Sequence, residues 1–183
     1  MSLTSPLKTP HLILGMARSG KSLYAERLIG TLAPPYTYIA TAQVLDDEMH
    51  ERVRLHRERR SSSWQTIESP FDLPRCLARL KGQNRPVLVD CLTLWLSNIL
   101  IAPSPPTPPE EAIDALCASL SAADHPLFLV STEVGGGIVP ENPLARRFRD
   151  VAGTAHQRIA AVCSSVTLVV AGLPLSLKST TKA

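Results

Sequence analysis

The sequence predicts an α/β protein with a mostly parallel sheet and helices on both faces. Five short apolar segments recur along the 183 residues, and segments of helical spacing or loop composition separate them. The apolar segments lack the polar alternation of half-exposed strands, which is typical of a parallel sheet covered on both sides. The expected strands are residues 12–14, 36–40, 87–89, 127–130 and 166–170.

The first expected strand leads into a phosphate-binding motif. Residues 15–22 match the pattern G-x-x-x-x-G-K-[ST], and the helical spacing of residues 23–29 follows directly. Gly15 and Gly20 permit backbone angles that turn successive N–H groups toward a phosphate at a helix amino end. Lys21 is expected to reach the β and γ phosphates, and the Ser22 hydroxyl to bind Mg²⁺. The predicted nucleotide-binding residues of this loop are Gly15, Met16, Ala17, Arg18, Ser19, Gly20, Lys21 and Ser22.

Residues 45–60 have helical periodicity. Met49, Val53, His56 and Arg60 fall on nearly one face of that helix, so His56 shares an apolar stripe, whereas His50 lies about 100° away from Met49. From spacing alone, a packed or surface role is favoured for both histidines.

The third expected strand ends at Asp90. That layout places a carboxylate where Walker B motifs hold Mg²⁺, although Asp90 could instead cap the helix that follows. The next segment is rich in proline and predicts a surface loop at residues 102–110, after which Glu110 could open a helix.

Length and composition predict one domain over residues 11–180, preceded by a flexible tail at residues 1–10. A net charge of +3, with basic residues clustered only near 52–60, argues against a nucleic-acid partner. The four cysteines form no C-x-x-C pair, and no apolar stretch is long and uninterrupted enough for a signal peptide or a membrane span. These features predict a cytoplasmic protein with reduced thiols.

Several blocks together resemble the bifunctional adenosylcobinamide kinase / adenosylcobinamide-phosphate guanylyltransferase family. They are GMARSGKS, YIATAQVLDDEMHERVRLHRERR, VDCLTLWLSN, TEVGGGIVPENPLARRFRDVAGTAHQR and VVAGLPLSLK, with a tryptophan at position 64. The resemblance spans about residues 12–178 and implies a RecA-like P-loop domain that forms homotrimers. It further implies that the enzyme phosphorylates adenosylcobinamide with ATP or GTP and then transfers GMP from GTP to adenosylcobinamide phosphate.

The resemblance also implies roles for particular residues. His56 matches the histidine that carries GMP covalently, and a neutral imidazole nitrogen is chemically suited to attack the α-phosphorus. Asp90 and Glu68 are each expected to bind either Mg²⁺ or the guanine base, whose adjacent N–H donors a carboxylate can accept. The further nucleotide contacts implied are Thr41, Ala42, Gln43, Arg57, Glu58, Arg59 and Arg60.

Other segments keep more than one interpretation. Residues 133–142 form a glycine-rich loop that could cover the site, contact the corrinoid or simply connect two elements. Arg146, Arg147 and Arg149 could bind phosphate or a neighbouring subunit, or form a solvated face. Met16, Thr132 and His156 differ from the residues common in the family. A kinase of single activity and a non-catalytic nucleotide switch remain the alternatives.

Overall fold

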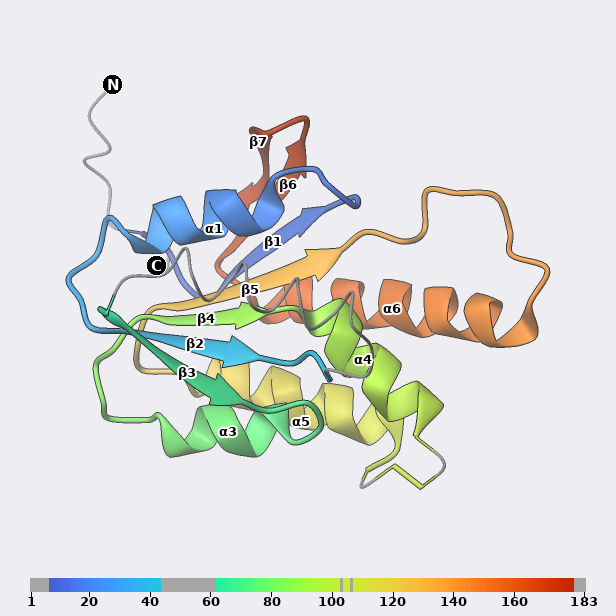
Figure 1. Cartoon of the computed structure of the whole chain (residues 1–183), viewed down its shortest axis with the longest axis horizontal. Coiled ribbons are helices and arrows are strands. Elements are labelled where there is room, and N and C mark those ends of the chain that lie inside the picture. The colour runs from blue at the N-terminus through green and yellow to red at the C-terminus, as the bar shows by residue number, and fades with distance from the viewer. Residues whose placement is uncertain (1–6, 44–61, 103, 106, 180–183) are drawn as a thin grey trace.

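The computed structural model describes residues 7–43, 62–102, 104–105 and 107–179. Its helices and strands alternate along the chain, as Figure 1 shows. In chain order they are β1 (His11–Gly15), α1 (Lys21–Ile29), β2 (Tyr36–Ala40), β3 (Trp64–Glu68), α3 (Leu73–Arg79), β4 (Val87–Asp90), α4 (Leu92–Ile101), α5 (Pro109–Ser121), β5 (Leu127–Thr132), α6 (Pro143–Val162), β6 (Ser165–Val170) and β7 (Leu173–Ser179).

The strands of the described chain form one seven-stranded sheet in the order β3-β2-β4-β5-β1-β6-β7. All neighbours pair in parallel except β6 and β7, which form an antiparallel hairpin. The five predicted strands are present. The two strands that were not predicted, β3 and β7, lie at the sheet edges, where half-exposed or polar residues weaken the apolar pattern.

Neighbouring residues of the central strands face two different cores. Leu12 and Leu14 pack with the cluster formed by α3, α4, α5 and α6. Ile13 lies between them in sequence and packs with α1 on the opposite face. Figure 1 shows the same division, with α1 on one side of the sheet and α3, α5 and α6 on the other. Since successive strand side chains point to opposite faces, apolar runs are required when both faces are covered. The predicted RecA-like P-loop α/β fold is confirmed.

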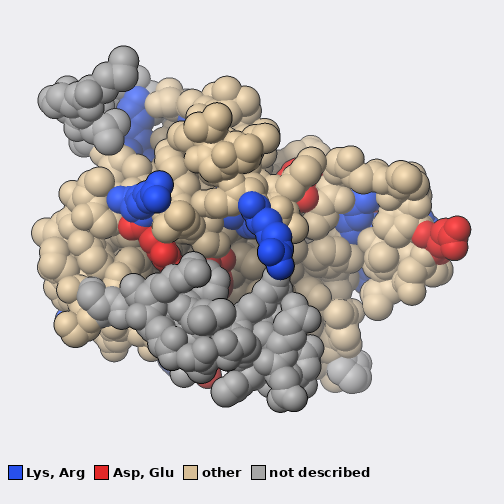
Figure 2. Space-filling model, turned by 45° about the horizontal axis from the view of Figure 1, so that its top comes forward, with Lys and Arg blue, Asp and Glu red and all other residues tan. Residues whose placement is uncertain are grey.

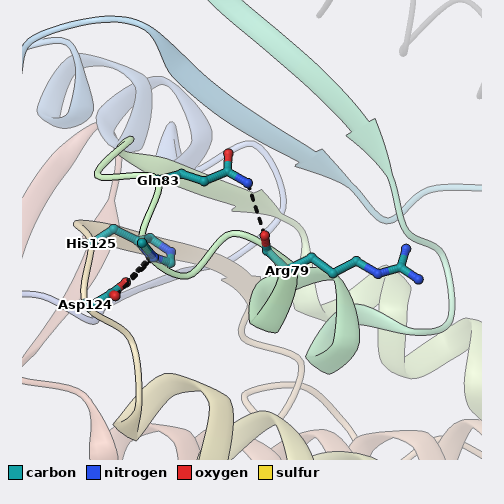
Figure 3. A network of polar contacts seen from close by, with 5 residues as sticks. Arg79, Gln83, Asp124 and His125 are labelled. Atoms are coloured by element: carbon teal, nitrogen blue, oxygen red, sulfur yellow. Dashed lines mark hydrogen bonds and ion pairs between the residues drawn. The ribbon is translucent and has the colours of Figure 1, made fainter.

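The amino ends of the strands are held by turns on the side away from the P-loop. Figure 3 shows His125 beside Asp124, with Nδ1 3.1 Å from Oδ1, and Gln83, whose side-chain amide donates to the carbonyl of Arg79 at 3.0 Å. Asp124 also accepts from the Gly82 N–H at 3.1 Å, so the turns before β4 and β5 are linked.

The predicted boundaries fall close to elements of the structure. In the region expected to be a tail, Leu7 packs against the core cluster on the α1 face. The helix α5 begins at Pro109, inside the expected loop, because proline is well suited to a first helical turn. At the other end β7 extends through Ser179, next to the expected end of the domain at residue 180. Within the described ranges, no helix combines the length and apolar composition needed to cross a membrane.

Candidate active site

One edge of the sheet gathers most of the predicted site residues. Strands β1 to β5 are parallel, so their carboxyl ends meet at the same edge. The P-loop follows Gly15 there, residues 41–43 follow β2, and Glu68 and Asp90 end β3 and β4. In open α/β sheets this edge is where ligands bind.

The P-loop backbone forms the expected cradle. Arg18 and Gly20 have positive φ angles of 57° and 90°, and the Ser19 N–H donates to the Met16 carbonyl at 3.2 Å. A Cβ at Gly15 would lie 2.7 Å from the carbonyl oxygen of Val169, so only glycine fits against β6. The buried Ser19 hydroxyl has no hydrogen-bond partner among the described residues.

Lys21 lies at the start of α1, where the amino end of the helix favours an anion. No acidic residue occupies the first turn of this helix. The Lys21 ammonium group donates to the carbonyl of Met16 at 3.2 Å and therefore lies over the P-loop. These positions are consistent with the predicted contacts to the β and γ phosphates.

The hairpin turn between β6 and β7 supports the P-loop from behind. The Gly172 N–H donates to the Ser19 carbonyl at 2.8 Å, and a Cβ at Gly20 would lie 3.2 Å from the Gly172 Cα. Ala171 and Gly172 both have positive φ, as the two central residues of a type I′ turn require. Sequence reasoning missed this support, although an Ala-Gly pair between two apolar runs was a usable signal.

Thr41 is buried and joins β2 to β4 beside Asp90. Its hydroxyl donates to the carbonyl of Cys91 at 2.7 Å and accepts from the Cys91 N–H at 2.9 Å. The Thr41 carbonyl accepts from the Asn98 side chain at 2.8 Å. The hydroxyl of Thr41 thus already has a donor and an acceptor within the protein. This arrangement fits a residue that positions the end of β4 better than one whose side chain binds nucleotide.

The site offers two oxygen donors for the predicted Mg²⁺. Ser22 directly follows the P-loop lysine, and Asp90 is the last residue of β4. In the sheet, β5 lies between β4 and β1. Hard oxygen ligands of this kind suit Mg²⁺, which usually keeps water and phosphate oxygens in its remaining positions. Among the described residues, no group of three or more His, Cys, Asp and Glu side chains could hold a metal alone.

The loop after β5 lies against the P-loop. The Glu133 N–H donates to the Gly15 carbonyl at 3.1 Å, and a Cβ at Gly136 would lie 3.2 Å from the Met16 side chain. These contacts bring residues 133–142 beside the P-loop, and their role as a cover, a corrinoid contact or a simple connection between two elements stays a prediction.

Comparison with known proteins places the whole arrangement in one family. The sequence profile of the family described as cobinamide kinase / cobinamide phosphate guanyltransferase matches residues 11–177. The chain belongs to this family. The family match extends from β1 into β7 and includes every site element described above.

The cobinamide kinase / cobinamide phosphate guanyltransferase relatives cover nearly all of the chain. The bifunctional adenosylcobalamin biosynthesis protein CobP of Pseudomonas aeruginosa is 47% identical over 167 residues, which are 91% of this chain and 96% of that protein. The corresponding protein of Salmonella typhimurium, CobU, is 41% identical over 179 residues, covering 91% and 98%. A Pyrococcus horikoshii structure, Project ID PH0250, is 9% identical with a TM-score of 0.53, covering 93% of this chain and 86% of that one, and shares the fold alone.

The two predicted carboxylates of this family member lie at different distances from the P-loop. Strands are spaced by about 4.8 Å, so the end of β4 lies roughly 10 Å from that of β1 and the end of β3 roughly 19 Å from it. Glu68 instead lines a cavity of about 520 Å³ together with Phe71, Arg75 and Cys76. Asp90 is consequently the better placed of the two for a metal at the P-loop.

The predicted guanylylation residues lie outside the described residues. They are His56, Arg57, Glu58, Arg59 and Arg60, within the segment 44–61. The described chain enters that segment from Gln43, at the same sheet edge as Asp90. On the face shown in Figure 2, the lysines and arginines of the described part of the chain lie in separate groups.

Proposed function

We propose that this protein phosphorylates adenosylcobinamide and then transfers GMP from GTP to the resulting phosphate, giving adenosylcobinamide-GDP and pyrophosphate. The observation that carries the proposal is the family match from residue 11 to residue 177. The P-loop supported by Gly172 and the Asp90 carboxylate at the adjoining sheet edge are consistent with it.

In the kinase step the alcohol oxygen of the aminopropanol arm attacks the γ-phosphorus of ATP or GTP, and the nucleoside diphosphate leaves. Catalysis consists mainly of positioning and of neutralising the phosphate charge. The P-loop amides and Lys21 bind the phosphates. Ser22 and Asp90 would hold Mg²⁺, which when bound neutralises charge on the phosphates. Residues Thr41, Ala42 and Gln43 lie at the same edge of the sheet. Thr41 contributes by positioning the end of β4 through its hydrogen bond to Cys91.

In the guanylyl step His56 attacks the α-phosphorus of GTP and pyrophosphate leaves. The cobinamide phosphate then displaces the imidazole from the phosphoramidate. The guanidinium groups of arginines can stabilise the negative charge that develops on the phosphate. We assign this role to some of Arg57, Arg59 and Arg60. Glu58, the other predicted nucleotide contact of this segment, lies between Arg57 and Arg59 in the sequence. The distance of Glu68 from the P-loop supports assigning it to the guanine base rather than to Mg²⁺.

The assembly proposed is a homotrimer in the cytoplasm. The edge strand β7 supports an interface between copies, because Leu173, Leu175 and Leu177 lie at alternate positions and are 72%, 57% and 55% exposed. An apolar row of this kind on an edge strand is unfavourable in water and is expected to be covered.

Labelling of the protein with α-labelled GTP tests the covalent step. After denaturation, the wild type is expected to retain a label that acid removes and base does not, and His56→Ala is expected to retain none. Transfer of phosphate to cobinamide without labelling would favour a kinase of single activity. The absence of both reactions would favour a nucleotide-dependent switch.

A further inference from the structure

A partly buried series of polar groups runs from the end of β5 to α6. The Thr132 N–H donates to the Thr93 hydroxyl at 2.6 Å, and the Thr93 and Ser131 hydroxyl oxygens lie 3.1 Å apart. The Ser131 hydroxyl oxygen lies 2.7 Å from His156 Nε2. On the other side of the ring, His156 Nδ1 lies 3.6 Å from a carboxylate oxygen of Glu133.

A consistent direction of proton donation follows from the backbone end of this series. The Thr132 N–H can only donate, so the Thr93 hydroxyl accepts from it. The Thr93 hydroxyl can then donate its own hydrogen bond to Ser131, and the Ser131 hydroxyl can donate to His156 Nε2. The imidazole then carries its proton on Nδ1 and directs it at Glu133. Burial lowers the pKa of His156, with the Glu133 charge acting in the opposite sense, which keeps Nε2 free to accept at neutral pH.

Glu133 is fixed at both its side chain and its backbone. One carboxylate oxygen accepts from the Gly135 N–H at 2.7 Å, the other faces His156, and the Glu133 N–H donates to Gly15 at the start of the P-loop. The side chain is nevertheless 34% exposed, whereas that of His156 is 7% exposed. The backbone of Glu133 thus contacts the first residue of the P-loop, and its carboxylate keeps an exposed surface that a second substrate can reach. Figure 1 shows the loop after β5 leaving this edge of the sheet before it turns back into α6.

We infer that Glu133 accepts the proton of the alcohol in the kinase step and that His156 positions Glu133. In this step the alcohol oxygen forms its bond to the γ-phosphorus, the bond from that phosphorus to the bridging oxygen breaks, and the alcohol proton passes to the Glu133 carboxylate. The nucleoside diphosphate leaves with the bridging oxygen, so no other reactant is needed. The inference rests on the proposed function and adds a residue that the sequence analysis did not assign to catalysis.

Two substitutions of Glu133 separate basicity from structure. Glu133→Gln keeps an oxygen for the Gly135 N–H but cannot take up the proton. We expect kcat for phosphorylation of adenosylcobinamide, followed with γ-labelled ATP and GTP, to fall about a hundred-fold or more. Guanylyl transfer to adenosylcobinamide phosphate supplied directly is expected to stay within about two-fold, since that acceptor is already ionised. Glu133→Asp is expected to recover part of the kinase activity, and the exposed Glu111→Gln on α5 to match the wild type.

Two substitutions of His156 separate its hydrogen bond to Ser131 from its contact with Glu133 at 3.6 Å. The amide nitrogen of Asn can take the place of Nδ1 and face Glu133, whereas the amide of Gln reaches the place of Nε2 and pairs with Ser131. If His156 acts through Glu133, His156→Asn retains more kinase activity than His156→Gln, with the difference in kcat rather than in KM. A purely structural histidine would give the reverse order, because Gln preserves the shorter contact, at 2.7 Å.

The outcomes distinguish this inference from the proposed function. A wild type that catalyses neither reaction overturns both. A wild type that catalyses both, with Glu133→Gln unchanged in the kinase step or reduced equally in the two steps, overturns only the role of Glu133. His156→Gln with higher kinase activity than His156→Asn overturns the positioning role.

Discussion

Thr41 and Cys91 exchange two hydrogen bonds across the ends of β2 and β4. The Thr41 hydroxyl donates to the Cys91 carbonyl at 2.7 Å and accepts from the Cys91 N–H at 2.9 Å. Both residues are buried, Thr41 completely. A side chain therefore supplies the hydrogen bonds of the backbone immediately after Asp90, where the parallel pairing of the two strands ends.

Replacement of Thr41 by Val should destabilise the protein by about 1–3 kcal/mol, because a buried N–H and a buried C=O lose their partner. Urea unfolding measures the change. Thr41→Ser keeps the hydroxyl and should lose only about 1 kcal/mol for the missing methyl group. A Thr41→Val variant as stable as the wild type would show that the hydroxyl contributes nothing to stability.

Replacement of Gly20 by Ala should weaken nucleotide binding about ten-fold or more, as titration with a fluorescent GTP analogue would show. Gly20 has a φ of 90° and a new Cβ would lie 3.2 Å from Gly172, so the P-loop must shift. Gly153→Ala is the matched control. It lies in α6 with no atom within 4 Å of the new Cβ, and should stabilise the protein by about 0.5–1 kcal/mol without changing affinity. Unchanged affinity in Gly20→Ala would contradict the inferred need for glycine.

His11 should make stability fall in mild acid. Burial on β1 lowers the pKa of His11 from 6.5 to about 4, and Nε2 lies 2.8 Å from the Thr167 hydroxyl. Between these values the unfolded chain binds a proton that the folded chain does not, so this contribution to stability is present above pH 6.5 and is lost toward pH 4.

The corresponding measurement is the free energy of unfolding at pH 7 and pH 5 for the wild type and His11→Gln. The variant should lose about 2 kcal/mol less than the wild type over this range. Gln can keep the contact with Thr167 but does not titrate, while His156 is present in both proteins and cancels. Parallel losses in the two proteins would exclude His11 as the source.

Replacement of Leu175 by Asp should lower the oligomeric state, because a charge in the apolar row of β7 opposes its burial against another copy. Light scattering after size-exclusion chromatography gives the mass in solution. Ile101→Asp is the control, since Ile101 is also exposed, at 62%, but lies at the end of α4. An unchanged mass for Leu175→Asp would place the trimer interface elsewhere.

Periodicity and one motif were enough to predict the layered α/β fold and the phosphate cradle. The central strands are buried on both faces, so their apolar runs were visible without knowledge of their neighbours. β3 and β7 were missed because edge strands are only partly covered and lack the continuous apolar runs of the central strands. In β7, Leu173, Leu175 and Leu177 alternate with polar residues and a proline.

The sequence by itself determined which residue types reach the carboxyl edge of the sheet, because the P-loop spacing and the strand ending at Asp90 depend only on local order along the chain. Tertiary structure alone decided how those residues are held. Thr41 meets Cys91 across 50 positions, Gly172 meets Ser19 across 153, and Ser131 meets His156 across 25. Hydrogen bonds of this kind depend on strand order and helix placement, which local patterns do not encode. For the same reason Glu133 and His156 became a pair only when β5 and α6 were packed together.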